Sequence, residues 1–312
     1  MSLARNILLR ASRSAWLADE LRRRAFFRRA TKRFMPGETL DDALGAAAGF
    51  AAVGIGTLLT ELGEQVTTAA ETEGVRDHYL EVMRQVRSRG LPAQISVKLT
   101  HLGLDRDRDL CARHLRHLLT GAEQSDSFVW IDMEESRYVD ATLALFRTAR
   151  AQSDRIGVCL QAYLRRTPTD LEALLPVSPT IRLVKGAYSE PPSVALPSKR
   201  DVDAQYFTLA SRMLEHRAAE RVAGRPTLPV FGTHDTQLIE RLRDRAKALA
   251  IPRDAWEVHM LYGIRSEDQR RLAADACTVR VLISYGSAWF AWYMRRLAER
   301  PANVWFVMRN LI

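Results

Sequence analysis

The chain has 312 residues, of which 47% are hydrophobic and 27% charged. This composition excludes an intrinsically disordered protein and allows a substantial core in one large or two smaller α/β domains. Lys and Arg number 46 against 37 Asp and Glu, giving a net charge of +9, so nucleic acid or an anionic membrane surface has to be considered as a partner.

The first 50 residues carry much of the positive charge, in a pattern that predicts helices from residue 4 to 50. Basic residues alternate there with Leu, Trp and Phe: Arg5, Arg10, Arg13, Arg22, Arg23, Arg24, Arg28, Arg29, Lys32 and Arg33. An amphipathic basic helix of this kind either touches phospholipid or acidic polymer, or packs on the body of the protein by its apolar stripe. We therefore divide the chain into an N-terminal helical arm, residues 1–50, and a main domain, residues 51–312.

Targeting signals and cysteines indicate the compartment. The N-terminus lacks an uninterrupted apolar stretch followed by a small-residue cleavage site, and residues 46–59 are too few for the roughly 20 apolar residues of a spanning helix. Cys111, Cys159 and Cys277 are odd in number and far apart, which suits neither a disulfide framework nor a zinc site. We expect a soluble protein in a reducing, cytoplasmic setting, with peripheral contact at the inner face of the membrane as an option, and no metal.

From residue 54 onward, eight short apolar or β-branched runs alternate with helix-length segments. The runs are residues 54–59, 93–98, 128–132, 156–161, 180–185, 227–232, 257–260 and 279–283. The helical segments are residues 76–89, 104–122, 139–151, 169–175, 201–220, 236–250 and 266–274. Eight strands with helices between them over about 250 residues predict a (β/α)₈ barrel. A doubly wound sheet is the alternative, but no G-x-G-x-x-G follows the first run.

Polar residues and glycines gather where five consecutive runs end, the second to the sixth. They are Lys98, Asp132 with Met133, Gln161, Arg182 with Lys185 and Gly186, and Gly232 with Thr233, His234 and Asp235. Any one has a structural explanation, such as a helix cap for Asp132 or a solvated charge for Lys185. Together they favour an active site, because a barrel carries its chemistry at the carboxyl ends of the strands. Thr233 and His234 at a strand-to-helix turn suit a phosphate.

Residues 287–301 are expected to form the last helix, ended by a proline. One face, within an arc of roughly 100°, carries Trp292, Arg295, Arg296 and Glu299. Adjacent guanidiniums suit a small anion such as a carboxylate, because each offers paired N–H donors in a plane. The competing interpretation is a solvated face with an Arg295–Glu299 pair, but the aromatic residues in the same turns weigh against it.

Several of these segments resemble the motifs of the proline dehydrogenase family, in order and approximate spacing. They are Ile181-Arg182-Leu183-Val184-Lys185-Gly186-Ala187-Tyr188, Gly232-Thr233-His234-Asp235 and Tyr293-Met294-Arg295-Arg296-Leu297-Ala298-Glu299-Arg300-Pro301-Ala302-Asn303, together with residues 62–64, 97–99 and 132–134. The resemblance runs from about residue 50 to the C-terminus. It implies a distorted (β/α)₈ barrel that holds non-covalent FAD and oxidises L-proline to Δ1-pyrroline-5-carboxylate, with the last helix over the barrel mouth.

The same resemblance implies roles for individual residues. The substrate carboxylate would be bound by Lys98, Arg295 and Arg296, with Glu64 pairing with Arg295 as a gate. Arg182 would hydrogen-bond near flavin N5, which receives the hydride, and Asp132 would order the hydrogen bonds of the active site. FAD would be lined by Met133, Gln161, Val184, Lys185, Gly186, Ala187, Thr233, His234 and Glu299. Electrons would leave to a quinone in the membrane.

Two positions depart from the family pattern near the substrate. Leu282 and Trp292 stand where the family usually has tyrosines. The reaction class is unaffected, but another cyclic amino acid or a proline derivative becomes an alternative substrate.

Two other classes of protein share single features of this sequence. A pyridoxal-phosphate barrel enzyme would use Lys98 or Lys185 for a Schiff base. A nucleic-acid or membrane-surface binding protein would need a continuous basic stripe with stacking aromatics. The aromatics here gather in the last helix, remote in sequence from the basic segment, so no nucleic-acid partner is expected.

Overall fold

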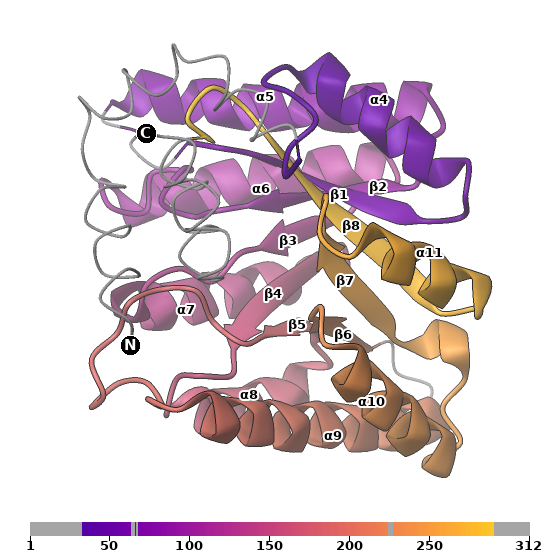
Figure 1. Cartoon of the computed structure of the whole chain (residues 1–312). Coiled ribbons are helices and arrows are strands. Elements are labelled where there is room, and N and C mark those ends of the chain that lie inside the picture. Colours follow the sequence, from indigo (N-terminus) through magenta and orange to yellow (C-terminus); the bar gives the residue numbers. More distant parts are fainter. Residues whose placement is uncertain (1–32, 64–65, 67, 224–226, 290–312) are drawn as a thin grey trace, which may run out of the picture.

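The computed structural model describes residues 33–63, 66, 68–223 and 227–289. Eight parallel strands close into one barrel in chain order, and each pairs with its sequence neighbours until β8 returns to β1 (Figure 1). The strands are β1 (Gly56–Glu61), β2 (Ala93–Val97), β3 (Val129–Ile131), β4 (Ile156–Gln161), β5 (Thr180–Val184), β6 (Leu228–Gly232), β7 (Glu257–Leu261) and β8 (Thr278–Tyr285). The predicted (β/α)₈ barrel is confirmed, with every predicted run matched by a strand.

Helices cover the outside of the barrel (Figure 1). They are α4 (Leu40–Ala51), α5 (Ala69–Ser88), α6 (Arg108–Gln124), α7 (Val139–Arg150), α8 (Thr167–Leu174), α9 (Lys199–Ala223), α10 (Thr236–Ala248) and α11 (Ser266–Ala274), with 3₁₀ turns η1 (Ser136–Tyr138), η2 (Leu175–Val177) and η3 (Arg253–Ala255). No helix within the described ranges is long and apolar enough to cross a bilayer.

Local sequence explains where several helices begin. Thr39 and Thr68 each accept a hydrogen bond from the third residue of the following helix, whose acidic side chain bonds back to the cap. These capping boxes satisfy N–H groups that a helix start leaves unpaired. In α10, Asp235 plays the same part by accepting from Leu238, so this helix starts within four residues of the end of β6.

The N-terminal segment departs in part from its predicted helical pattern. Within the described residues, 33–39 form turns and bends, and helix begins only at Leu40. A helix cannot continue through this stretch because Pro36 lacks an N–H and Gly37 favours other conformations. Helix α4, which crosses the predicted end of the arm at residue 50, packs against β1 and β8. The division of the chain at residue 50 stays a prediction.

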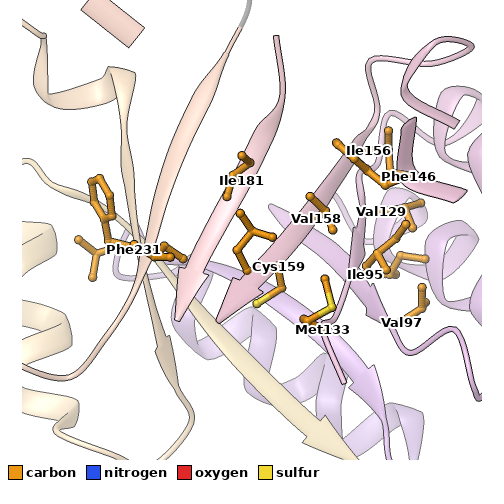
Figure 2. Close-up of a cluster of buried hydrophobic side chains, with 14 of the residues drawn as sticks. Ile95, Val97, Val129, Met133, Phe146, Ile156, Val158, Cys159, Ile181 and Phe231 are labelled. Carbon is orange, nitrogen blue, oxygen red and sulfur yellow. The ribbon is translucent and has the colours of Figure 1, made fainter. Parts of the chain in front are cut away.

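Apolar residues on the outward faces of the strands form the main core with the helices. This shell is continuous from α4 around the barrel to β8. Figure 2 shows part of it, with Val129 and Ile156 of neighbouring strands near Phe146 of α7. Because this shell carries the apolar packing, the barrel interior is free to hold polar groups.

The register between strands stacks the inward-facing side chains in layers. In an eight-stranded barrel with a shear of about eight, every second strand contributes one side chain to a given layer. To find the next member of a layer, one follows the register across two strands and then moves about two residues toward the carboxyl end. The observed pairing, Trp130 with Gly157 and Gly157 with Thr180, thus brings Trp130 level with Arg182. The same rule applied to the remaining pairs gives one layer of four: Leu58, Trp130, Arg182 and His259.

The layers differ in character from one end of the barrel to the other. Below the Arg182 layer lie Gln94, Gly157, Val230 and Arg280, and above it lie first Ser96, Cys159, Gly232 and Leu282 and then Thr60, Asp132, Val184 and Leu261. Gly157 makes room for the indole, since a Cβ there would come within 2.7 Å of Trp130. Trp130 therefore plugs the barrel, and everything above it faces the mouth.

Candidate active site

A cavity of about 830 Å³ opens at the carboxyl ends of the strands, at the upper end of the size range for cofactor and ligand sites. All twelve predicted site residues within the described part of the chain line it: Lys98, Asp132, Met133, Gln161, Arg182, Val184, Lys185, Gly186, Ala187, Thr233, His234 and Leu282. The other five, Glu64, Trp292, Arg295, Arg296 and Glu299, lie outside the described residues. The individual roles of all these residues remain predictions.

Arg182 lies at the floor of the cavity with one terminal nitrogen fully engaged. Nη2 donates to Ser96 Oγ at 3.0 Å and to Asp132, while Ser96 Oγ donates to the same carboxylate at 2.8 Å. Below, the guanidinium carbon stands 5.0 Å from the centre of the Trp130 ring, within the range of a cation–π contact. Nη1 is buried and has no hydrogen-bond partner among the described residues. A rigidly held cation thus keeps free donors at the cavity floor.

Gln161 supplies an unpaired acceptor in the same cavity. Its Nε2 donates to the carbonyls of Met133 and Glu134 at 2.8 and 2.9 Å, so the amide oxygen faces away from them. This Oε1 is buried and has no donor among the described residues. Buried polar atoms in proteins are normally paired, so an unpaired donor and an unpaired acceptor in one cavity indicate a ligand with both acceptor and donor groups.

The rim near β5 and β6 is more charged. Lys185 Nζ donates to Asp203 at 2.5 Å and to Asp235 at 3.3 Å. Lys199 and Arg265 also line the cavity, as do Thr236 and Gln237 in the first turn of α10. Cations beside a helix N-terminus favour an anion, so this side of the cavity suits a phosphate group.

Gly186 follows β5 where the chain passes close to Tyr163. Its φ of 116° favours glycine, and a Cβ there would overlap the Tyr163 ring. His234 also has a structural task, since its Nε2 accepts from the Leu261 N–H at 3.3 Å. The turns after β5 and β6 therefore lie against their neighbours at the cavity wall.

Sequence reasoning missed several residues of this site. Cys159, His259, Ser284 and Thr60 line the cavity, and Ser96 bonds to both Arg182 and Asp132. The alternation of side chains along a strand could have revealed these residues. Ser96, Cys159 and His259 each stand two residues before a strand-end residue, so each shares the face of that residue. Attention to the last residue of each strand alone overlooked the layer beneath.

The three cysteines are free and buried. Burial raises the pKa of Cys159 although the Arg182 guanidinium opposes it, so the thiol beside the arginine stays protonated. No group of three or more His, Cys, Asp and Glu within the described residues is arranged to hold a metal ion.

Comparisons with known proteins agree with this arrangement. The family model described as "Proline dehydrogenase" matches residues 43–309. "Proline dehydrogenase 1" of Bacillus subtilis subsp. natto is 34% identical over 281 residues, which cover 90% of each chain. "Proline dehydrogenase" of Deinococcus radiodurans is 35% identical over 286 residues, covering 90% of this chain and 89% of the relative.

A solved structure extends the comparison to the fold. The chain superposes on proline utilization A (PutA) from Bdellovibrio bacteriovorus inactivated by N-propargylglycine with a TM-score of 0.80 and 22% identity. The match covers 95% of this chain but only 36% of that longer one. With the family model and the relatives over most of their length, these matches show that the chain belongs to the proline dehydrogenase family of oxidoreductases.

Proposed function

We propose that this chain uses non-covalently bound FAD to oxidise L-proline to Δ1-pyrroline-5-carboxylate and passes the electrons to a quinone. The observation that carries the proposal is Arg182, held by Asp132 and Ser96 with Nη1 unpaired at the floor of the cavity. A fixed positive charge stabilises negative charge that develops above it during reaction. Because the chain belongs to the proline dehydrogenase family, the reaction in which this charge acts is the oxidation of proline.

The residues present fit FAD. The unpaired donor of Arg182 and the unpaired acceptor of Gln161 suit a heteroaromatic ring that has both acceptor nitrogens and an N–H. Lys185, Arg265 and the first turn of α10 suit a diphosphate. When bound, FAD supplies the acceptor for the hydride of the substrate. The chain would bind the ring with Arg182 and Gln161 and keep water away with the apolar side chains of Met133, Val184 and Leu282.

The substrate carboxylate would lie near Lys98, on the opposite side of the barrel mouth from the phosphate-binding rim. Lys98 lines the cavity from the end of β2, whereas Lys185 and α10 belong to the β5–β6 side. We propose that Arg295 and Arg296 bind the same carboxylate, with Glu64 as the gate and Trp292 above the ring; these four lie outside the described residues. Glu299, also outside them, is assigned to the cofactor.

The second substrate hypothesis rests on Leu282. This residue reaches the cavity from β8, in contact with the cluster of Leu58, Trp130 and Val230. An apolar side chain where the family usually has a tyrosine removes a hydroxyl from the substrate pocket. The alternative is therefore a proline derivative or another cyclic amino acid with an alkyl-bearing ring.

A quinone acceptor would require contact with a membrane surface. The basic segment of residues 4–33 gives this part of the proposal its support, because basic amphipathic segments are attracted to anionic lipid. Its structure lies almost wholly outside the described residues.

The test is a visible spectrum of the purified protein, followed by an assay with L-proline and a soluble quinone. We expect flavin absorption bands that bleach on addition of L-proline, and release of the flavin by heat or acid because no covalent link holds it. A colourless protein that does not bind added FAD would overturn the cofactor assignment. Bleaching by other cyclic amino acids but not by L-proline would overturn the substrate.

A further inference from the structure

A histidine lies at the floor of the candidate site, in the same layer as Arg182. The side chain of His259 on β7 is 3% exposed, and its Nε2 is 2.9 Å from Glu257 Oε2. Glu257 also accepts from Arg280 Nε at 2.9 Å. Burial lowers the pKa of His259 to about 4, although Glu257 opposes the shift. The imidazole is therefore neutral at physiological pH.

The carboxylate determines which nitrogen of His259 carries the proton. An ionised carboxylate can only accept, so Nε2 holds the proton and donates it to Glu257. Nδ1 is then a hydrogen-bond acceptor. It is buried and has no partner among the described residues, which is unusual for a buried polar atom.

The register of the barrel identifies the donor for this acceptor. Arg182 pairs with Val230, Val230 pairs with Glu257, and His259 stands two residues further on, so Arg182 and His259 are adjacent members of one layer. Both lie against Trp130, with the His259 ring centre 5.3 Å from the indole and the guanidinium carbon 5.0 Å from it. Arg182 Nη1 is the only nitrogen donor on a described barrel strand that is buried without a partner.

We propose that His259 is a positioning residue for Arg182, its Nδ1 linked to the guanidinium through one bridging water molecule. This inference rests on the proposed function, in which Arg182 stabilises the charge transferred to FAD. Asp132 and Ser96 hold Nη2 from one side of the barrel, and His259 would hold the other side. Glu257 and Arg280 fix the imidazole in turn, so that the lower layers support the orientation of the arginine.

The test replaces His259 with two residues of similar size that differ in their ability to form hydrogen bonds. His259→Gln keeps a donor for Glu257 and an acceptor for Arg182, whereas His259→Met is of similar size and keeps neither. Leu58→Met is the matched control, because Leu58 belongs to the same layer but does not line the cavity, and a Leu-to-Met exchange conserves volume. The readouts are the flavin midpoint potential, the rate constant for flavin reduction by L-proline per bound flavin, and the midpoint of urea unfolding.

We expect His259→Met to lower the reduction rate constant by about tenfold and to make the flavin potential more negative, with the proline dissociation constant changed less than about twofold. His259→Gln should restore both properties, and Leu58→Met should leave both unchanged. If His259→Met alters only the unfolding midpoint, or if the Gln and Met variants have the same potential and rate constant, the positioning role is wrong. A wild-type protein that binds no FAD or does not oxidise proline would instead overturn the proposed function.

Discussion

The lower and upper halves of the barrel interior are built on the same eight strands, yet they treat their polar groups in opposite ways. Below the Trp130 layer, Glu257 accepts from both Arg280 and His259, and Gln94 accepts from the indole N–H at 2.7 Å. At and above the Trp130 layer, the described atoms His259 Nδ1, Arg182 Nη1 and Gln161 Oε1 are buried without partners. The polar groups of the lower half bond to one another and stabilise the fold. The upper half leaves hydrogen-bonding groups for a ligand, as barrel enzymes do at this face.

The sharpest test of the upper half is Arg182→Met. We expect kcat per bound flavin to fall about 100- to 1000-fold, the loss typical when a preorganised electrostatic donor is removed. The matched control is Arg212→Met, which removes an arginine paired with Glu172 on the protein surface. Steady-state rates with L-proline, corrected for flavin content, provide the measurement. An Arg182 variant as active as the control would mean that the unpaired nitrogen has no part in the reaction.

For the lower half, the corresponding substitution is Glu257→Gln. Burial alone would raise the pKa of Glu257, but the hydrogen bond from His259 and the charge of Arg280 outweigh it and lower the pKa to about 2. The carboxylate is therefore ionised, and its neutralisation should cost about 3 kcal/mol of the free energy of unfolding, as for a broken buried ion pair.

The control for this substitution is Glu81→Gln, which breaks an exposed pair with Arg84 and should cost less than about 1 kcal/mol. Urea unfolding of both variants gives the comparison. Similar losses for the two would remove the distinction between the buried network and a surface ion pair.

The pH dependence of stability reports the same lower network. The pKa of His259 falls from 6.5 to about 4 on folding, so the unfolded chain binds the extra proton first and stability declines as pH drops from about 6.5 to 4. The lowered pKa of Glu257 adds a further decline from about pH 4.5 to 2. Each step should amount to at most about 3 kcal/mol.

Urea unfolding at intervals from pH 7 to pH 4 measures the first step. His259→Gln should remove it, because the glutamine does not titrate. A wild-type stability that stays constant over this interval would contradict a buried neutral histidine.

The smallest expected effect concerns selectivity at the mouth. With Leu282 in the substrate pocket, a ring hydroxyl left without a partner should cost about 1–3 kcal/mol, so we expect kcat/KM for trans-4-hydroxy-L-proline to be about 5- to 150-fold below that for L-proline. Leu282→Tyr should narrow the difference. Equal turnover of both substrates by the wild type would contradict an apolar substrate pocket.

The sequence was sufficient for the order of elements and for the residues at the ends of the strands. Strand runs such as residues 156–161 and 180–185 and helices such as 266–274 were predicted to within two residues, because apolar periodicity, glycines and helix caps act locally. Once eight strands and a barrel were inferred, Lys98, Asp132 and Gln161 had to meet at one face, since parallel strands in a barrel end together.

Only the tertiary structure decided which side chains share a layer. Arg182 lies level with Trp130 and His259, although it is 52 residues from the first and 77 from the second along the chain. This arrangement follows from the register of each strand on the next and from the shear of the closed barrel. Register is set by packing between elements far apart in sequence, so the strand period of two could place Ser96 and His259 on the inward face but could not reveal which side chains they lie beside.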